Sequence, residues 1–412
     1  MNGTVINTLQ KGVDFIKRQE RTFKINLMRV SSQNFFLYLT QQYQSIYATL
    51  LGADPVQLGM LNSIGGLASA AISAPTGWLA DRWGIKRVLL FGLPLMALAA
   101  LIFAVSTNWL MVLPAFLLSM LSLRQVMTVC PMVCGSCLKS EERATGMQLC
   151  DTLSAAPRLI APIFAAFVIT AFGGITLEGI KPLYYLQVVG FSVLWLFTLR
   201  KFENPLSRAA SRDTSSLVDG IRDVLGLGGT VRRWILFICF ATVPMFVNTA
   251  YLPLFAAEFK GADQFVLSGM ATASTFMPLL LSIPIGRLAD TFGRKRVIFL
   301  LTPIYISSIL ILVFAPNTTF LIISSILQGV LMLGMVTQGA MTAELVPPSL
   351  LGRWYGILGV FRGIVGIVSP LIAGLIWSNV GPAYVFLFII ITEISKIVIL
   401  ITIPETLKKG ND

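Results

Sequence analysis

The sequence predicts an all-α membrane protein with twelve transmembrane helices, arranged as two six-helix, pseudo-symmetric halves. Two observations predict this fold. First, 55% of the 412 residues are hydrophobic and only 12% are charged, whereas about a quarter of the residues of a soluble domain are charged. Second, a charged pattern that begins at Gly77 is written again at Gly286, which indicates an internal repeat.

Long apolar runs define the twelve predicted helices. Each run is close to the about 20 residues that an α-helix needs to cross the hydrocarbon core of a bilayer. The runs are continuously apolar and do not alternate, so they lack the pattern of a transmembrane β-barrel. We expect the helices at residues 25–51, 56–80, 87–106, 109–138, 144–172, 183–200, 233–257, 264–289, 296–315, 318–345, 352–378 and 382–403.

The distribution of basic residues predicts the orientation in the membrane. The net charge of +12 is by itself compatible with nucleic-acid binding. However, the loops predicted on one side hold only two basic residues, Lys181 and Lys260, and apart from four inside spans the rest lie on the other side. This bias is typical of the cytoplasmic face. We therefore expect a multi-pass protein of the cell membrane, with both termini cytoplasmic and no nucleic-acid partner.

The chain is expected to divide into five segments. The first residues lack a compact apolar core before a cleavage site, and Val5, Leu9, Val13 and Ile16 instead recur at helical spacing. This pattern predicts an amphipathic helix on the cytoplasmic leaflet or, as the alternative, a partly ordered tail. The segments are a cytoplasmic amphipathic N-terminal segment 1–24, an N-terminal six-helix bundle 25–200, a cytoplasmic linker 201–232, a C-terminal six-helix bundle 233–403 and a cytoplasmic tail 404–412.

An internal repeat at an offset of 209 residues relates the two bundles. Gly52–Asp54 matches Gly261–Asp263, and Gly77–Val88 matches Gly286–Val297 at eight positions. The two copies have the same orientation, so an axis along the membrane normal relates them. A central substrate site is expected at the interface of such repeats.

The repeated pattern carries a family resemblance. The spacing Gly-x-x-x-Asp-x-x-Gly-x-Lys-Arg begins at Gly77 and again at Gly286, and "AELVPPSLLGR" follows at Ala343–Arg353. These segments resemble the signature loop of the major facilitator superfamily and that family's segment after the tenth helix. The resemblance implies a secondary active transporter that works by alternating access, without enzymatic chemistry or cofactor. It also implies a monomer in the lipid bilayer that binds a small-molecule substrate.

The resemblance implies a conformational latch at the charged pattern. In the family, the aspartate that corresponds to Asp81 holds the halves together on the cytoplasmic side, where it faces the start of the eleventh helix near Gly352. An anion at a helix N-terminus is favourable. In the second copy we expect Glu344 to pair with Arg296. The alternative is that the basic residues only set the topology. The predicted latch residues are Gly77, Asp81, Gly84, Arg87, Asp290, Arg296 and Glu344.

Ionisable residues inside the spans are candidate site residues, because charge at membrane depth is costly. Arg124, Arg158 and Arg362 lie on helices that line the cavity in the family. Guanidinium groups match carboxylate and phosphate, so these arginines favour an anionic substrate. Asp151 is the candidate proton carrier, or alternatively the partner of one arginine. Glu393 and Lys396, one helical turn apart, are interpreted as an internal pair.

Polar side chains form a stripe along the first span. Asn34, Tyr38 and Gln41 recur on one helical face, which predicts substrate binding or, as the alternative, hydrogen bonds between helices. Three cysteines share a face of the fourth span. Thiolates bind soft metals, but small residues at helix contacts are the commoner explanation, so we expect no metal site. The cysteines are Cys130, Cys134 and Cys137.

The sequence therefore favours a secondary active transporter of a small organic solute, leaning towards an anion, with proton coupling as an open option. The chain has no Gly-x-x-x-x-Gly-Lys-Ser/Thr loop, so ATP-driven transport is not expected. One alternative is a multidrug or hydrophobic-compound exporter that works as a proton antiporter. Another, of a different class, is a non-transporting membrane sensor.

Overall fold

The computed structural model describes residues 18–137, 143–203, 226, 228–347 and 350–405. Within its helices it does not describe the side chains of residues 69–70, 72–82, 124–132, 134–136, 143–149, 151 and 351–353. The predicted N-terminal segment 1–24, linker 201–232 and tail 404–412 lie largely outside the described residues.

Each of the first six predicted spans contains helix. The first span is broken near its middle, where a short 3-10 helix separates two α-helices, and the other five are single helices. The elements are α2 (Arg21–Thr40), η1 (Gln41–Tyr43), α3 (Gln44–Leu50), α4 (Pro55–Trp83), α5 (Ile85–Val105), α6 (Trp109–Cys137), α7 (Arg143–Ala171) and α8 (Leu177–Lys201).

The last six predicted spans are also helical, and the tenth is divided at Gly329. Within the described residues, nine helical segments are long and apolar enough to cross a membrane by length and composition. The elements are α10 (Gly229–Lys260), α11 (Gln264–Phe292), α12 (Arg294–Phe314), α13 (Thr318–Gln328), α14 (Val330–Leu345), α15 (Leu351–Asn379) and α16 (Pro382–Ile401).

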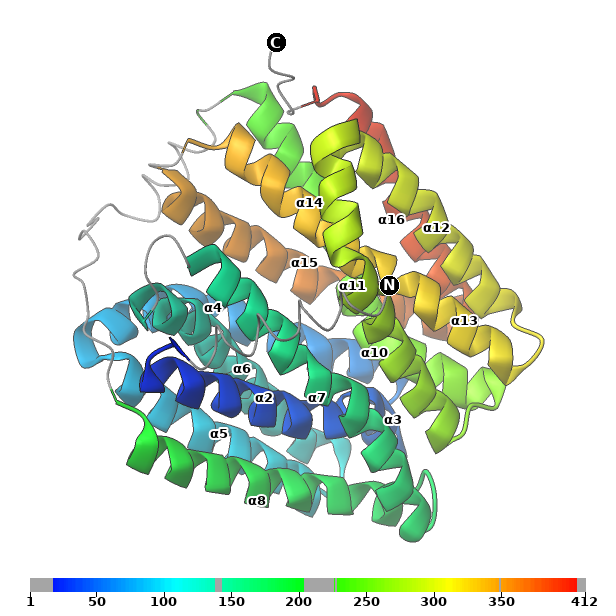
Figure 1. The fold of residues 1–412 in the computed structure, drawn as a ribbon. Helices are drawn as coiled ribbons and strands as arrows, with labels where there is room; N and C mark the ends of the chain where they lie inside the picture. Colours follow the sequence, from blue (N-terminus) through cyan, green and yellow to red (C-terminus); the bar gives the residue numbers. More distant parts are fainter. Residues whose placement is uncertain (1–17, 138–142, 204–225, 227, 348–349, 406–412) are drawn as a thin grey trace, which may run out of the picture.

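The helices form two groups with the same packing pattern (Figure 1). In the first group α2 packs against α7 and α8, and α5 packs against α6 and α8. In the second, α10 packs against α15 and α16, and α12 packs against α13 and α16. The interface between the groups is made by α4 with α15 and by α11 with α7. These two contacts are equivalent under the repeat, so the halves are pseudo-symmetric.

Single glycines join the helices at the repeated charged pattern. Gly84 connects α4 to α5 with a φ of 85°, and Gly293 connects α11 to α12 with a φ of 106°. Residues with a side chain rarely adopt such angles, because the Cβ atom clashes with the backbone. The two copies of the pattern therefore share a backbone geometry as well as a sequence.

A second pair of repeated turns lies at the other end of the bundle. Asp54 accepts a hydrogen bond from the Gln57 amide at 2.8 Å, and Asp263 accepts one from the Val266 amide at 2.8 Å. A carboxylate that bonds the third residue onward caps the N-terminus of a helix. Both aspartates belong to the repeated Gly-Ala-Asp sequence, so the repeat explains why α4 and α11 begin alike.

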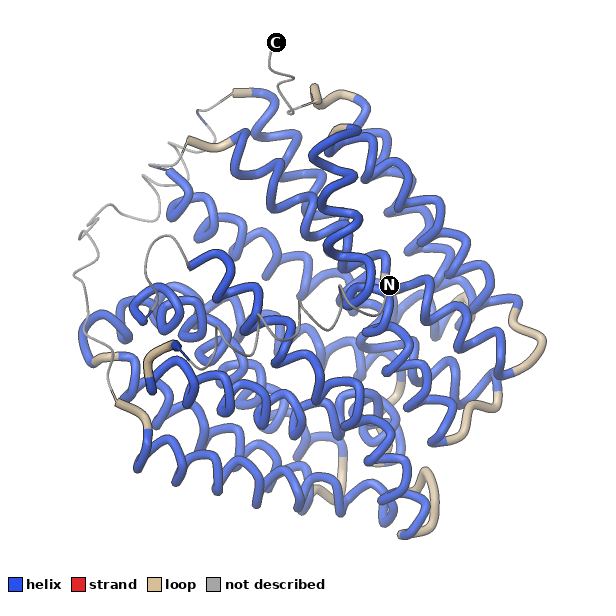
Figure 2. The backbone as a smooth tube through the Cα atoms, viewed as in Figure 1, coloured by secondary structure: helices blue, strands red, loops and turns tan. Residues whose placement is uncertain are grey.

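The bundle has two distinct ends, seen as the loops of Figure 2. We call "short-loop end" the end formed by the connections 51–54, 106–108, 172–176, 261–263, 315–317 and 380–381. The "basic end" is the opposite one, where α2 begins and α8 ends. One buried apolar cluster at the short-loop end joins both halves, with Tyr43, Leu58, Val247 and Ala373 among its members.

At the basic end the buried apolar side chains form two separate clusters. The first belongs to the N-terminal half and includes Phe23 and Phe191. The second belongs to the C-terminal half and includes Trp234 and Trp354. As far as the structure describes the chain, the halves therefore share a core only at the short-loop end.

Two tyrosines cross the interface at the short-loop end. The Tyr43 hydroxyl donates to the Gln264 carbonyl at 3.0 Å, and the Tyr251 hydroxyl lies 2.9 Å from the carbonyls of Pro55 and Pro370. Gln264 begins α11 and Pro55 begins α4. Each half thus sends a tyrosine to the first residue of the second span of the other half.

Close backbone packing between α4 and α15 supports the same seal. A Cβ atom added to Gly59 would lie 2.6 Å from the Pro370 carbonyl oxygen, and one added to Gly374 would lie 2.6 Å from the Pro55 oxygen. Nearer the basic end of α15, a Cβ atom on Gly356 or Gly359 would meet no described atom within 4 Å. The described part of the contact is therefore tight towards the short-loop end.

Candidate functional site

A cavity of about 660 Å³ lies between the two halves. Its wall combines residues of α2, η1 and α7 from one half with residues of α10, α11, α13 and α14 from the other. From mid-depth, at Tyr38 and Asn248, the wall continues towards the basic end at Ser282 and Val336. The seal at the short-loop end lies on its other side.

The break in the first span brings two amides to the cavity. Gln41 and Gln42 belong to η1 and line the wall. Gln42 is only 6% exposed, and neither its Oε1 nor its Nε2 forms a hydrogen bond with the residues that the structure describes. Because a buried unpaired amide is costly, it is a natural partner for a polar ligand. Short 3-10 segments within helices often mark functional sites.

Arg158 supplies a positive charge to the cavity wall. Its guanidinium carbon lies 5.3 Å from the centre of the Tyr38 ring, a distance at which the ring attracts the cation. Its Nε atom is buried and makes no hydrogen bond in the described part of the chain. Arg158 is the one charged side chain among the described residues of the wall.

A polar network begins at the wall and runs behind it. Asn248 donates its Nδ2 hydrogens to the Tyr305 hydroxyl at 2.9 Å and to Gln328 Oε1 at 3.2 Å. Gln328 in turn donates to Ser324 at 3.0 Å. The Oδ1 atom of Asn248 is buried and has no hydrogen-bond partner among the described residues, which leaves an acceptor at the cavity.

The division of the tenth span also lies at the cavity. Gly329 lines the wall between α13 and α14, and an added Cβ atom would lie 2.7 Å from Met277 Cβ and 2.8 Å from the Ser274 carbonyl oxygen. A glycine is thus required where α13 approaches α11. Interrupted helices of this kind often line the substrate sites of transporters.

The structure brings only some of the predicted site residues together. Tyr38, Gln41 and Arg158 line the cavity. Asn34 is buried and donates to the Ser154 carbonyl at 2.7 Å, so it ties α2 to α7, which is the alternative raised from the sequence. Arg362 does not belong to the described wall. The side chains of Arg124, Asp151, Cys130 and Cys134 lie outside the described residues.

The sequence made Asn248 of the seventh span only a weaker candidate and did not single out Gln328. Both lie in apolar runs, where the amide itself was the available signal. Arg29 was assigned to the basic side of the membrane, yet it is fully buried and donates to Asn26 and Gln33 at 2.8 and 2.9 Å. Arg29 lies near polar residues in the first turns of the span, so the sequence did not indicate that its side chain would be buried.

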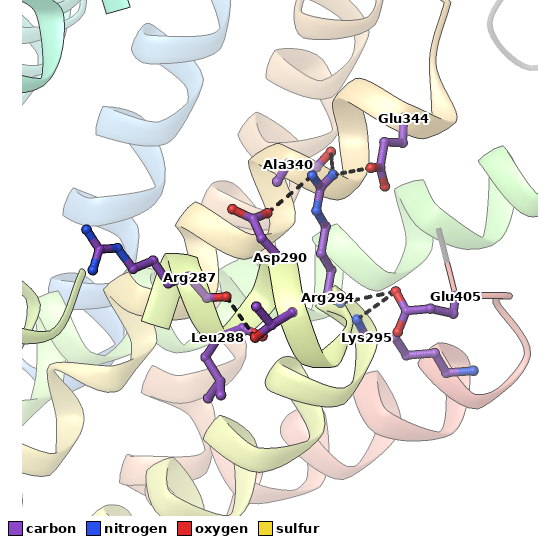
Figure 3. A network of polar contacts seen from close by, with 9 residues as sticks. Arg287, Leu288, Asp290, Arg294, Lys295, Ala340, Glu344 and Glu405 are labelled. Atoms are coloured by element: carbon purple, nitrogen blue, oxygen red, sulfur yellow. Dashed lines mark hydrogen bonds and ion pairs between the residues drawn. The ribbon is translucent and has the colours of Figure 1, made fainter. Parts of the chain in front are cut away.

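A charge network occupies the second copy of the repeated pattern (Figure 3). Arg294 contacts Glu344 at 2.7 Å and Asp290 at 3.6 Å, and it donates to the Ala340 carbonyl at 2.7 Å. These contacts join α11, α12 and α14 at the basic end. Asp290 and Glu344 therefore belong to one network, which lies within the C-terminal half.

The predicted pair between Glu344 and Arg296 is not formed. Arg296 is exposed and donates to the Phe292 carbonyl at 3.4 Å, whereas Arg294 holds Glu344. Successive helical residues are rotated by about 100°, so Arg296 points away from the face of α12 on which Arg294 meets α14. The basic residue immediately after Gly293, rather than the last one of the motif, is the partner.

Glu405 closes this network from the far end of the chain. Its carboxylate accepts from the backbone amides of Arg294 at 3.1 Å and Lys295 at 3.4 Å, the first residues of α12. An anion is favourable at a helix N-terminus. Lys295 donates in the opposite direction, to the carbonyl of Ile403 at 2.6 Å. The segment after α16 is thereby attached to α12 (Figure 3).

The first copy of the pattern is described only in part. Gly84 takes its predicted place at the joint before α5, and Arg87 is exposed in the first turn of that helix. The side chain of Asp81, together with Gly77, lies outside the described residues. The predicted latch at Asp81 therefore stays a prediction.

Comparison with known proteins assigns the fold to a family. The sequence profile of the Major Facilitator Superfamily matches residues 27–277 and 249–412. The chain belongs to the major facilitator superfamily. It is accordingly a multi-pass membrane protein of a transporter family, as the motifs indicated. The cavity between its halves is where a superfamily member with such repeats is expected to hold its substrate.

Similar superfamily sequences match only segments of the chain. An uncharacterized MFS-type transporter of Mycobacterium tuberculosis is 34% identical over 90 residues, 22% of this chain and 13% of that protein. The niacin transporter of Acinetobacter baylyi is 29% identical over 140 residues, 34% of this chain and 30% of that protein. The chain thus spans less than a third of the length of these relatives, so their activities do not transfer directly.

Solved structures resemble the chain over nearly its whole length. A nucleoside transporter has a TM-score of 0.74 at 17% identity and covers 93% of this chain and 98% of its own. A D-xylose-proton symporter has a TM-score of 0.72 at 12% identity, with 95% and 100% covered. At such low identity these likenesses show the fold of the superfamily alone.

Proposed function

We propose that this superfamily member carries a small organic solute with an anionic group across the membrane by alternating access, coupled to protons. The observation that carries the proposal is Arg158, a half-buried cation with a buried Nε atom in the wall of the cavity between the halves. A guanidinium fork with an unpaired N–H matches a carboxylate or phosphate oxygen. The niacin transporter that matches part of this chain is named for an organic acid, which agrees with this chemistry.

The remaining wall is suited to the rest of such a solute. Unpaired amide atoms of Gln42 and Asn248 can pair with hydroxyl, carbonyl or amine groups. The volume of about 660 Å³ falls within the range of about 300–1,000 Å³ that is typical of small-molecule sites. A solute of one or two rings or a short branched chain would fill it.

The two ends of the bundle support alternating access. Among the described residues, the halves share a core and hydrogen bonds at the short-loop end, whereas the two clusters near the basic end are separate. This is the arrangement expected of one end state, with the cavity accessible from the basic end. If the termini are cytoplasmic, as the basic residues predict, the state faces inward.

Asp151 is the proton carrier in this proposal. Asp151 lies seven residues before Arg158 on α7, about two helical turns away, so the two are expected on a similar face. A carboxylate near a guanidinium can release the guanidinium when it takes up a proton, and can pair with it again when the proton leaves.

Thermal unfolding in detergent tests the substrate class. We would compare small carboxylates with their neutral carboxamides, using the wild type, Arg158→Gln and the control Arg233→Gln. Arg233 is exposed at the basic end, where it donates to the Thr402 carbonyl. A ligand that binds the folded state raises the unfolding temperature. We expect carboxylates to stabilise the wild type and the control but not Arg158→Gln; equal shifts in all three would contradict an anion site at Arg158.

A second candidate is an exporter of hydrophobic compounds. Apolar and methionine side chains make up a large part of the wall, and flexible methionines suit varied ligands. Lipophilic cations in the same assay would then stabilise the wild type as well as or better than carboxylates, with no effect of Arg158→Gln. These wall residues are Met245, Leu252, Met270, Leu331, Met332 and Leu333.

A further inference from the structure

A buried ion pair lies in the last helix, away from the cavity wall. Lys396 donates to Glu393 Oε2 within α16, and the two side chains are 6% and 0% exposed. The other carboxylate oxygen, Oε1, is buried and has no hydrogen-bond partner in the described part of the chain. Glu393 is the twelfth of the twenty residues of α16, so the pair lies near mid-depth.

The pair is connected to the cavity through Tyr305. Glu393 is close enough to act electrostatically on the Tyr305 hydroxyl, which is fully buried in α12. That hydroxyl accepts from Asn248, and among the described residues its own proton has no acceptor. Asn248 lines the cavity. Asn248 and Tyr305 thus lie between the wall and the region in which the field of Glu393 acts.

We propose that Glu393 is a proton-binding site behind the wall of the substrate cavity, and that its protonation leaves a positive charge on Lys396. In one state the pair is a carboxylate and an ammonium, with no net charge. When Glu393 takes a proton from water, its carboxylate becomes a carboxylic acid, and Lys396 is left with an unbalanced positive charge. Unbalanced charge in a low-dielectric interior is costly, and a nearby anion relieves that cost.

Proton binding and anion binding are thereby linked. An anionic solute in the cavity favours the protonated pair, and the protonated pair favours the anion, because such coupling is reciprocal. This linkage rests on the function proposed above, whereas proton binding at Glu393 does not. The Oε1 atom is the site of protonation, since Oε2 already accepts from Lys396.

Other ionisable groups near α16 are placed differently. Lys396 on α16 itself is the charged group that acts on Glu393, and Glu393 in turn acts on Tyr305 of α12. On α10, Tyr251 is bonded to Pro55 and Pro370, and Cys239 lies in the field of Arg362 on α15. These groups therefore do not replace Glu393 as the proton acceptor of this region.

A pH jump applied to proteoliposomes on a solid-supported membrane tests the site with the proton as the probe and without substrate. We expect a transient current in the wild type that Glu393→Gln largely abolishes. The matched control is Glu178→Gln, because Glu178 and Lys181 form an exposed pair with the same three-residue spacing. The control should keep the current. A full current in Glu393→Gln would overturn the proposal.

Lys396→Gln keeps the carboxylate and provides a second test in case Glu393→Gln does not fold. Its current should survive with a midpoint about 1–3 pH units higher, because the carboxylate loses the cation that favours its ionised form. An unchanged midpoint would overturn the proposal. Asp151→Asn separates the two ideas: if it alone abolishes the current, protons are coupled at Asp151 and not at Glu393, whereas no current in the wild type contradicts proton coupling as a whole.

Discussion

Tyr43 and Tyr251 make equivalent hydrogen bonds in opposite directions across the interface between the halves. Tyr43 reaches Gln264, and Tyr251 reaches Pro55, which corresponds to Gln264 in the repeat. Both tyrosines are fully buried. A pseudo-twofold axis relates the two bonds, and both have to break when the halves separate at the short-loop end. We therefore expect this end to open as one unit.

Removal of either hydroxyl should favour opening at the short-loop end. In Tyr43→Phe and Tyr251→Phe we expect a loss of about 0.5–1.5 kcal/mol each, which raises the ratio of open to closed molecules about two- to tenfold. Spin labels at the exposed residues Phe172 and Val380 would report the separation of the halves. Tyr184→Phe is the control, because the described residues offer its buried hydroxyl no partner; opening in that variant as well would argue against the two bonds.

Added bulk between α4 and α15 should have a similar effect by a steric route. A Cβ atom at Gly59 would lie 2.6 Å from the Pro370 carbonyl oxygen, so Gly59→Ala must push the helices apart. Overpacking of this kind costs about 1–3 kcal/mol. The same spin-label distance should lengthen in Gly59→Ala and stay constant in Gly339→Ala, where the new methyl group meets no described atom within 4 Å.

The side-chain amide of Gln42 should lower the free energy of unfolding of the protein when no ligand is bound. Replacement by leucine removes a buried polar group that has no hydrogen bonds among the described residues. We therefore expect the free energy of unfolding of Gln42→Leu to rise by about 1–3 kcal/mol, and its unfolding temperature to rise with it. It should also respond less to carboxylate ligands. Gln33→Leu should behave in the opposite way, because Gln33 accepts from the buried Arg29. Lower stability of Gln42→Leu would show that its amide is satisfied in solution.

Arg294 should matter more than Arg296 for the C-terminal half. Arg294→Gln removes contacts with Glu344, Asp290 and the Ala340 carbonyl, and bonds to charged groups contribute about 1.5–3 kcal/mol each at most. We expect a clear drop in stability against mixed-micelle denaturation. Arg296→Gln should change it little, since the exposed Arg296 makes one long bond, at 3.4 Å, to the carbonyl of Phe292 at the end of α11. The reverse order would restore the pairing that the sequence suggested.

The fold was largely predictable because its signals are local. Apolar runs of membrane length place the helices, and the repeated glycines mark positions such as Gly84 and Gly293 where only a residue without Cβ fits. The superfamily motifs supplied the arrangement of the halves. None of these inferences requires knowledge of which side chains meet.

The site was only partly predictable because it depends on helix rotation and breaks. Asn34, Tyr38 and Gln41 share a stripe, yet Asn34 turns to Ser154 while the other two line the cavity. The first and tenth spans are divided at η1 and at Gly329. A run of apolar residues does not predict where such a helix is interrupted. Arg29 shows the same limit, since its burial follows from neighbours on other helices.

Most hydrogen bonds across the short-loop seal are accepted by main-chain carbonyls, although the Thr170 hydroxyl accepts one from Gln264 at 2.9 Å. Besides the two tyrosines, Ser63 donates to the Ile367 carbonyl at 2.5 Å and Thr272 donates to the Leu159 carbonyl at 3.0 Å. Every residue type carries a carbonyl, so the acceptor positions tolerate substitution, whereas the donors do not. In a saturation mutagenesis library, the positions of the acceptor residues should therefore tolerate many substitutions, whereas the positions of the donor residues should tolerate few. Sequence variation alone would therefore reveal only the donor side of each bond.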